Sequence, residues 1–166
     1  MNKSMQNTSL CYIEKDKKYL MLHRTKKQND YNHDKWIGIG GKFEEGESPE
    51  ECILREVKEE TGLILTSLDY RGIVTFVSDD NFTEYMHIFY SDSFTGNLIE
   101  CDEGNLEWVD KEKMNDLPHW KGDEIFLELL DKKVPFFSLK LIYTNGLLKK
   151  AILNQKEISF KKTLFF

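Results

Sequence analysis

The chain has 166 residues, enough for one domain with a buried core. Its 40% hydrophobic and 13% aromatic residues exclude a disordered chain, and no apolar run approaches the ~18 residues of a membrane-spanning helix. The net charge of −6 argues against binding to a nucleic-acid backbone, which requires a basic surface.

The cysteines indicate the compartment. Cys11, Cys52 and Cys101 are odd in number and widely spaced, and they match neither a zinc-binding pattern nor a disulfide framework. Such cysteines are typical of a reducing cytoplasm. The first ten residues also lack the apolar stretch of a secretory signal peptide. We therefore expect a cytoplasmic protein with no membrane partner.

The first predicted element is a hairpin. Leu10–Glu14 and Tyr19–His23 have strand-like composition and flank the charged turn Lys15–Lys18. The polar segment Arg24–Lys35 follows and is predicted to be a loop.

A helix is predicted for Ser48–Thr61. Ser48 and Glu51 form a capping box, and Pro49 occupies the first helical position. Gly62 supplies the residue at which the helix ends. Both ends of the helix are therefore defined by the sequence.

Two stripes of side chains run along this predicted helix. Glu56, Glu59 and Glu60 are spaced at i, i+3 and i+4, so they share one face. The neighbouring arc is apolar and consists of Ile53, Leu54 and Val57. Such a helix can pack on a core and still present its carboxylates at the rim.

Further strands and a second helix follow. Aromatic and β-branched residues predict a hairpin of Tyr70–Val77 and Thr83–Phe94. Leu106–Val109 is predicted to be a short strand, Lys111–Asn115 a helical turn, and Gly122–Leu130 a helix with apolar residues at helical spacing.

The C-terminal part is predicted to be a third hairpin and a tail. Phe136–Tyr143 and Leu147–Leu153 flank the turn residues Asn145 and Gly146. Residues from about 154 to 166 are interpreted as a mobile tail of a single domain that spans 1–166. Because hairpins dominate, we expect an α+β fold in which helices cover a mixed sheet.

The acidic helix face permits two interpretations. Clustered glutamates are usually a solvated surface. Here, however, the upstream glycines Gly38, Gly40 and Gly41 allow a tight backbone path with free carbonyl groups. Carboxylates, a carbonyl and water are the hard oxygen ligands of Mg²⁺ or Mn²⁺. We therefore favour a metal site that also binds substrate phosphates.

The segment GKFEEGESPEECILREVKEETGL at 41–63 resembles the Nudix box, G-x5-E-x7-R-E-U-x-E-E-x-G-U with U aliphatic. Its fixed positions are occupied by Gly41, Glu47, Arg55, Glu56, Val57, Glu59, Glu60, Gly62 and Leu63. The resemblance implies an α/β/α sandwich and metal-dependent hydrolysis of a nucleoside diphosphate linked to another group.

The resemblance also implies roles for individual residues. The expected metal ligands are Gly40 through its carbonyl, Glu56, Glu59, Glu60 and Glu103. Glu103 is included because a glutamate in that place completes the metal cluster of the MutT-like branch. Glu56 is the preferred general base, with Glu59 and Glu103 as rivals, and Arg55 is expected to orient a carboxylate. Glu47 is as consistent with a structural role as with a catalytic one.

Segments outside the box bear on the substrate. MLHR at 21–24, KWIGIGGK at 35–42, CDEGNLEWVD at 101–110 and HWKGDEIFLELL at 119–130 resemble a Gram-positive MutT-like branch that acts on oxidised purine nucleotides. Expected substrate contacts are Arg24 and Lys42 at phosphates and Ile37, Phe76, Trp120 and Asp123 at the base. Gly122 and Ile37 replace an acid and an asparagine that contact the base in the related mammalian enzyme, so two polar contacts are missing.

Three functions remain open from the sequence. The first is hydrolysis of a nucleoside triphosphate, such as 8-oxo-dGTP, to monophosphate and pyrophosphate. The second is hydrolysis of ADP-ribose or a dinucleoside polyphosphate, and the third is a non-catalytic nucleotide sensor. In each case we expect a small-molecule ligand and a monomer or homodimer.

Overall fold

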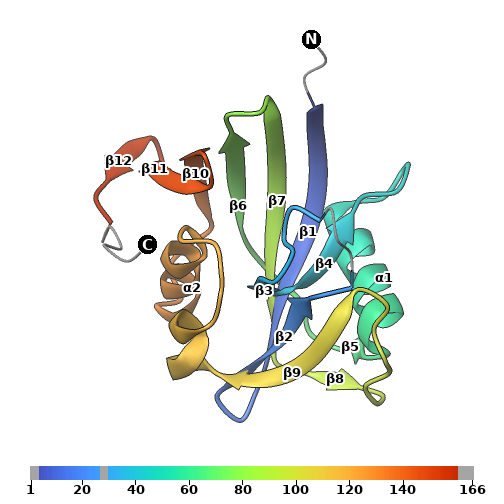
Figure 1. Ribbon diagram of the computed structural model, residues 1–166. Helices are drawn as coiled ribbons and strands as arrows, with labels where there is room; N and C mark the ends of the chain where they lie inside the picture. The colour runs from blue at the N-terminus through green and yellow to red at the C-terminus, as the bar shows by residue number, and fades with distance from the viewer. Residues whose placement is uncertain (1–3, 27–29, 161–166) are drawn as a thin grey trace.

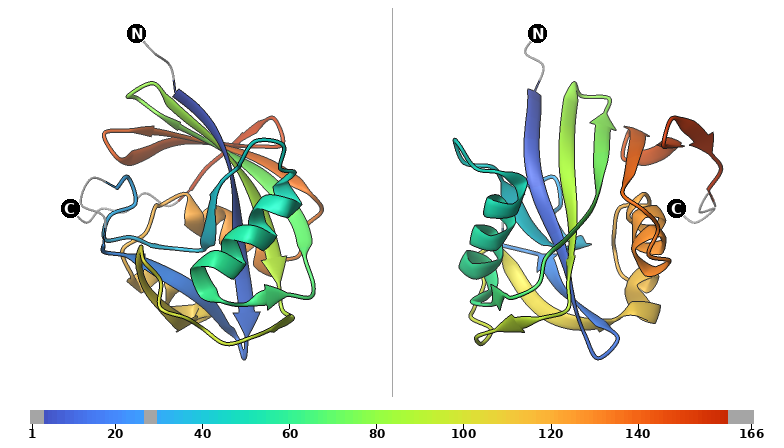
Figure 2. Two further views of the ribbon diagram at one scale, coloured as in Figure 1. Left: turned by 90° about the vertical axis from the view of Figure 1, so that its right-hand side faces the viewer. Right: turned by 180° about the vertical axis from the view of Figure 1, so that it is seen from behind.

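The computed structural model describes residues 4–26 and 30–160. A ten-stranded mixed sheet forms the middle layer (Figure 1). Helix α1, Pro49–Thr61, lies on one side of the sheet, and helix α2, Asp123–Asp131, lies on the other (Figure 2). The predicted α+β fold, an α/β/α sandwich built on a mixed sheet, is confirmed.

The strands of the large sheet are β1 (Ser4–Lys15), β2 (Lys18–Arg24), β3 (Trp36–Ile37), β4 (Ile39–Lys42), β6 (Asp69–Ser78), β7 (Phe82–Ser91), β9 (Gly104–Asp110), β10 (Phe137–Thr144), β11 (Leu147–Leu153) and β12 (Lys156–Ile158). A separate pair consists of β5 (Ile64–Leu65) and β8 (Phe94–Thr95). The short 3-10 helix η1, Lys111–Asp116, lies between β9 and α2 in the chain.

The first predicted hairpin is present, but its strands soon separate. β1 and β2 pair only beside their turn, at Glu14 with Tyr19 and Lys15 with Lys18. β1 then runs parallel to β7 and antiparallel to β4, whereas β2 pairs with β9 and β3. The divergence lets β4, which leads into α1, lie beside β1.

Several short strands were not predicted. β3 and β4 lie in the segment KWIGIGGK, for which no strand was predicted. β5 and β8 have two residues each. Segments of two to four residues are too short to show an alternating pattern. Their pairing comes from neighbours distant in the sequence.

The expectation of a mobile tail from about residue 154 is wrong for its first part. Lys156–Ile158 forms β12 and pairs with β11 at the sheet edge. Phe160 packs against the core. The remaining residues of the predicted tail, 161–166, lie outside the described part of the chain.

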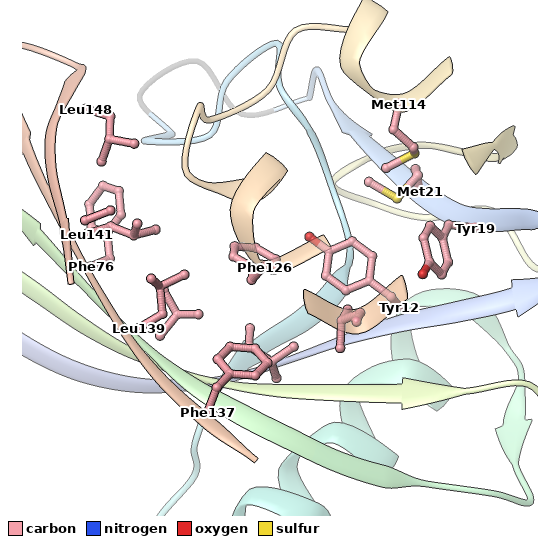
Figure 3. Close-up of a cluster of buried hydrophobic side chains, with 14 of the residues drawn as sticks. Tyr12, Tyr19, Met21, Phe76, Met114, Phe126, Phe137, Leu139, Leu141 and Leu148 are labelled. Atoms are coloured by element: carbon pink, nitrogen blue, oxygen red, sulfur yellow. The ribbon is translucent and has the colours of Figure 1, made fainter. Parts of the chain in front are cut away.

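Each face of the sheet has its own core. The larger cluster lies on the α2 side, and Figure 3 shows Phe126 of α2 among Tyr12, Phe137 and Leu139 of the strands. The cluster on the α1 side contains Ile53 and Val57 of the helix together with Phe89 of β7. The two clusters explain why both helices dock on the sheet.

The predicted ends of α1 are confirmed. Ser48 and Glu51 form both hydrogen bonds of the capping box, and Gly62 ends the helix with φ of 80°. The prediction that Leu54 belongs to the core-facing apolar stripe of α1 was wrong, because Leu54 is 43% exposed. Cys52 is buried on that face instead. A turn of about 100° per residue carries Leu54 past the buried face. No helix in the described part of the chain is long and apolar enough to cross a membrane.

Candidate active site

A cavity of about 740 Å³ extends from the carboxylates of α1 to aromatic side chains near the start of α2. It is lined by ten of the residues expected at the site, namely Arg24, Ile37, Gly40, Lys42, Glu56, Glu60, Phe76, Glu103, Trp120 and Asp123. Arg55 and Glu59 are not part of the lining. The fold thus brings together residues that are up to about a hundred positions apart in the sequence.

Three carboxylates occupy one end of this cavity, those of Glu56, Glu60 and Glu103. The Oε2 atom of Glu60 is buried and has no hydrogen-bond partner among the described residues. Burial, followed by the charges of Glu103 and Glu56, raises the pKa of Glu60 to about 9. Burial also raises the pKa of Glu56, although Arg55 opposes the shift. Arg24 and Arg55 reach Glu103 and Glu56, but neither guanidinium bonds the buried Oε2 atom of Glu60.

The carboxylate end fits a divalent cation. An orphaned buried carboxylate oxygen beside two further carboxylates is a set of hard oxygen donors, and a cation would offset their mutual repulsion. In the described residues, no three acidic, histidine or cysteine side chains yet stand close enough together to hold an ion. Glu103 accepts from Arg24 Nη1 and Glu56 from Arg55 Nη1, each at 2.7 Å. Both bonds would rearrange when a metal is bound.

Arg55 forms hydrogen bonds with Glu47 and Glu56 beside the carboxylate end of the cavity. Its Nε and Nη2 atoms donate to the two carboxylate oxygens of Glu47 at 2.6 and 2.9 Å. Hydrogen bonds from Arg55 and from the backbone of Glu44 lower the pKa of Glu47 to about 2. Glu47 therefore holds Arg55, and Arg55 in turn holds Glu56.

Glu59 lies outside the cavity. Its side chain is 59% exposed and accepts from Arg55 Nη1 at 3.1 Å. Sequence spacing placed Glu59 on the face of Glu56 and Glu60, but the helix turns its carboxylate toward Arg55 instead.

Gly41 meets Glu56 at close range. A Cβ atom at position 41 would lie 2.4 Å from the Glu56 carboxyl carbon, a distance that a real contact does not allow. A side chain at position 41 would therefore displace the Glu56 carboxylate from its place beside β4. The glycine of the motif is therefore explained by the approach of strand and helix.

Aromatic rings form the other end of the cavity. Trp120 and Phe76 pack edge to face with ring centroids 5.2 Å apart, and Tyr31 stacks on Phe82 at 5.3 Å and on Trp120 at 5.9 Å. The indole N–H of Trp120 donates to Asn32 Oδ1 at 2.7 Å. The loop at 30–32 thus closes this end against the start of α2.

Phe76 serves both the core and the cavity. It is only 7% exposed and packs on Tyr143, as expected of a core ring. Its remaining surface nevertheless lines the cavity beside Trp120. Phe76 therefore belongs both to the core and to the wall of the cavity.

Asp123 and Gly122 begin helix α2 at the aromatic end. Asp123 is 8% exposed, and burial raises the pKa of its carboxyl to about 7. A Cβ at Gly122 would lie 2.4 Å from Leu141 Cδ1, so an acid has no room there. Ile37 lines the cavity and offers only apolar surface.

Comparison with known proteins identifies the family. The NUDIX domain profile matches residues 4–130. An uncharacterized Nudix hydrolase of Bacillus subtilis, YvcI, is 33% identical over 77% of this chain and 80% of its own length. The chain belongs to the Nudix family. It is a hydrolase that acts on phosphoanhydride bonds.

Other Nudix proteins extend the comparison. The oxidized purine nucleoside triphosphate hydrolase of Danio rerio is 34% identical over 66% of this chain and 71% of its own length. The crystal structure of a MutT protein from Bacillus halodurans superposes with a TM-score of 0.78 at 24% identity, covering 90% of this chain and 97% of that one. That structure supports the MutT-like fold.

Several residues of the Nudix cavity were missed by the sequence analysis. They are Gln6, Thr8, Tyr31, Asn32, Phe82, Glu84 and Met86. Tyr31 and Asn32 sit in a loop without periodicity, so no pattern marks them. Glu84 did carry a signal, because it is the single charged residue in the strand FTEYMHIFYS. A charge at alternating register with apolar neighbours indicates a polar group on an otherwise apolar face.

Proposed function

We propose that this Nudix enzyme hydrolyses a purine nucleoside triphosphate to the monophosphate and pyrophosphate, and that it acts on oxidised purines such as 8-oxo-dGTP. The observation that carries the proposal is the single cavity with carboxylates at one end and four aromatic rings at the other. A nucleotide has the same polarity, with charged phosphates at one end and a flat base at the other. The similarity to the Danio rerio enzyme supports the same substrate class.

The carboxylate end would hold Mg²⁺ or Mn²⁺ through Glu56, Glu60 and Glu103, with the carbonyl of Gly40 nearby. When bound, the ion would offset phosphate charge and make a bound water more acidic. Glu59 lies outside the cavity, so we propose that it helps to orient Arg55 instead of binding the ion.

Glu56 is our choice for the general base that removes the proton of the attacking water. Burial raises its pKa toward neutrality, where a base transfers protons most effectively, and Arg55 fixes its orientation. Arg24 and Lys42 line the cavity on the way to the carboxylates and can contact phosphate oxygens.

At the aromatic end, Trp120 and Tyr31 stack on each other, and we propose that the base packs beside this pair of rings. Asp123 offers a carboxyl group to polar atoms at the base edge. The three cysteines of the chain are free thiols and buried, consistent with our proposal of a cytoplasmic enzyme that removes damaged nucleotides before DNA synthesis.

The proposal is tested by measuring pyrophosphate release from 8-oxo-dGTP and dGTP and phosphate-ester products from ADP-ribose and Ap4A, with Mg²⁺ and with EDTA. We expect Mg²⁺-dependent turnover of the triphosphates, fastest with 8-oxo-dGTP. Glu60→Gln serves as the inactive control. Faster turnover of ADP-ribose or Ap4A would refute the substrate class, and no turnover of any compound would favour a nucleotide sensor.

A further inference from the structure

Glu84, in the strand β7, is one of the residues that line the cavity. In the strand register it is opposite Gln6 of β1 and opposite Phe76 of β6. Its neighbours on the same face of β7 are Phe82 and Met86, which also line the cavity. A carboxylate therefore stands among apolar and aromatic side chains where a base would rest.

Two donors fix the orientation of this carboxylate. Thr8 Oγ1 donates to Glu84 Oε2 at 2.7 Å, and Gln6 Nε2 donates to Oε1 at 3.3 Å. Thr8 is itself buried. A carboxylate has about four lone-pair sites, so two acceptor sites remain after these bonds.

The remaining acceptor sites require donors. The described residues give Glu84 no ion-pair partner within 4 Å, although Lys42 acts on it at longer range and opposes the effect of burial on its pKa. An acceptor that faces an apolar cavity loses its water when a ligand binds, which is unfavourable unless the ligand supplies a hydrogen-bond donor. The donors of a nucleotide are the hydroxyl groups of its sugar and the N–H groups of its base, and the proposed function places the base, not the sugar, among these aromatic rings.

We propose that Glu84 determines base specificity by accepting a hydrogen bond from an exocyclic amino group of a purine. The proposal rests on the proposed function, in which the base occupies the aromatic end. Asp123 stands at the start of α2, lines the same cavity and feels the charge of Glu84, so a carboxyl group from the sheet and one from the helix face one base. A purine that lacks the amine loses this hydrogen bond to Glu84.

The test uses pairs of nucleotides that differ only by the amine. dGTP and dITP differ by the 2-amino group, and dATP and purine deoxyriboside triphosphate differ by the 6-amino group. We expect wild-type kcat/KM to favour the amine-bearing member of one pair by at least about tenfold, as is usual where a site is built to pair a polar group. The pair that shows the preference identifies which amine is read.

Glu84→Gln keeps the size of the side chain and an oxygen for Thr8 but replaces one acceptor with a donor. We expect it to reduce the ratio of kcat/KM between the two members of that pair to within about threefold. Glu14→Gln is the matched control, because Glu14 lies in β1 away from the cavity and bonds Tyr90 and Lys111. It should keep the wild-type preference.

Equal loss for both members of each pair in Glu84→Gln would show that Glu84 only ties β7 to β1, and this result would overturn the proposal. Binding of the corresponding monophosphates, measured by calorimetry, separates this outcome from failure of the proposed function. An amine preference in binding that Glu84→Gln removes, in a protein without turnover, would support the role of Glu84 and reject the hydrolase. If the protein binds both members of each pair equally well, Glu84 does not determine base specificity, and this conclusion holds with or without turnover.

Discussion

The backbone N–H of Gly122 donates a hydrogen bond to the hydroxyl of Tyr143, 2.7 Å away. The start of α2 is thereby fixed to strand β10, which pairs with β6 in the large sheet. This contact sets the position of Asp123, the next residue, at the cavity. It also explains the absence of an acid at position 122, since the Tyr143 hydroxyl and Leu141 occupy the space that a side chain would need.

Tyr143→Phe should lower the free energy of unfolding by about 1–3 kcal/mol, because it leaves the buried N–H of Gly122 without a partner. Urea unfolding followed by circular dichroism measures the change. Tyr85→Phe is the control, since the described residues give the Tyr85 hydroxyl no hydrogen bond. If both variants lose the same amount, the Gly122 bond contributes nothing.

Asp123→Asn should change how stability depends on pH. The pKa of Asp123 is raised to about 7 by burial, so between pH 4 and 7 the unfolded chain loses this proton while the folded protein keeps it. Stability of the wild type therefore falls over this range, by at most about 4 kcal/mol from this group. The asparagine variant lacks this contribution.

Unfolding free energies of the two proteins at pH 4.5 and 7.5 provide the measurement. The variant should gain stability relative to wild type as the pH rises. Asp131→Asn, with a side chain 66% exposed at the other end of α2, is the matched control and should show a smaller change. A difference between Asp123→Asn and wild type that does not vary with pH would contradict the raised pKa.

Glu56→Gln and Glu59→Gln should differ in activity, although both residues lie on the helix α1. Glu56 lines the cavity, so its amide variant should lose at least about a hundredfold in kcat/KM, the usual contribution of a general base. Glu59 is outside the cavity and should retain activity within about tenfold. Activity within tenfold of wild type in Glu56→Gln, with the fold intact by circular dichroism, would rule out Glu56 as the base.

Arg55→Gln should lower kcat/KM by at least about tenfold and shift the acidic limb of the pH–rate profile to higher pH. The guanidinium lowers the pKa of Glu56, so its removal lets that carboxyl keep its proton to higher pH. Arg71→Gln is the control, because Arg71 lies outside the cavity lining and, among the residues that the structure describes, donates a hydrogen bond to the Val134 carbonyl at 3.4 Å. An unchanged profile in Arg55→Gln would mean that Arg55 serves structure alone.

The elements that were predicted correctly share strong local signals. Helix α1 carries its own caps in Ser48, Glu51 and Gly62, and these act within a few residues. The hairpin of β10 and β11 turns at Asn145 and Gly146, both with positive φ. The short strands β3 and β4 have no such signal, because their structure depends on pairing with β2 and β1.

The candidate site divides in the same way. The sequence by itself determined the reaction class through its resemblance to the Nudix box, in which Arg55 and the three glutamates that follow it fall at helical spacing. Tertiary structure alone decided that Glu56 and Glu60 face the cavity while Glu59 faces Arg55. It also decided that Tyr31 and Glu84 line the same cavity. Contacts between a loop, three strands and α2 depend on packing between residues far apart in the chain, and local periodicity does not encode such packing.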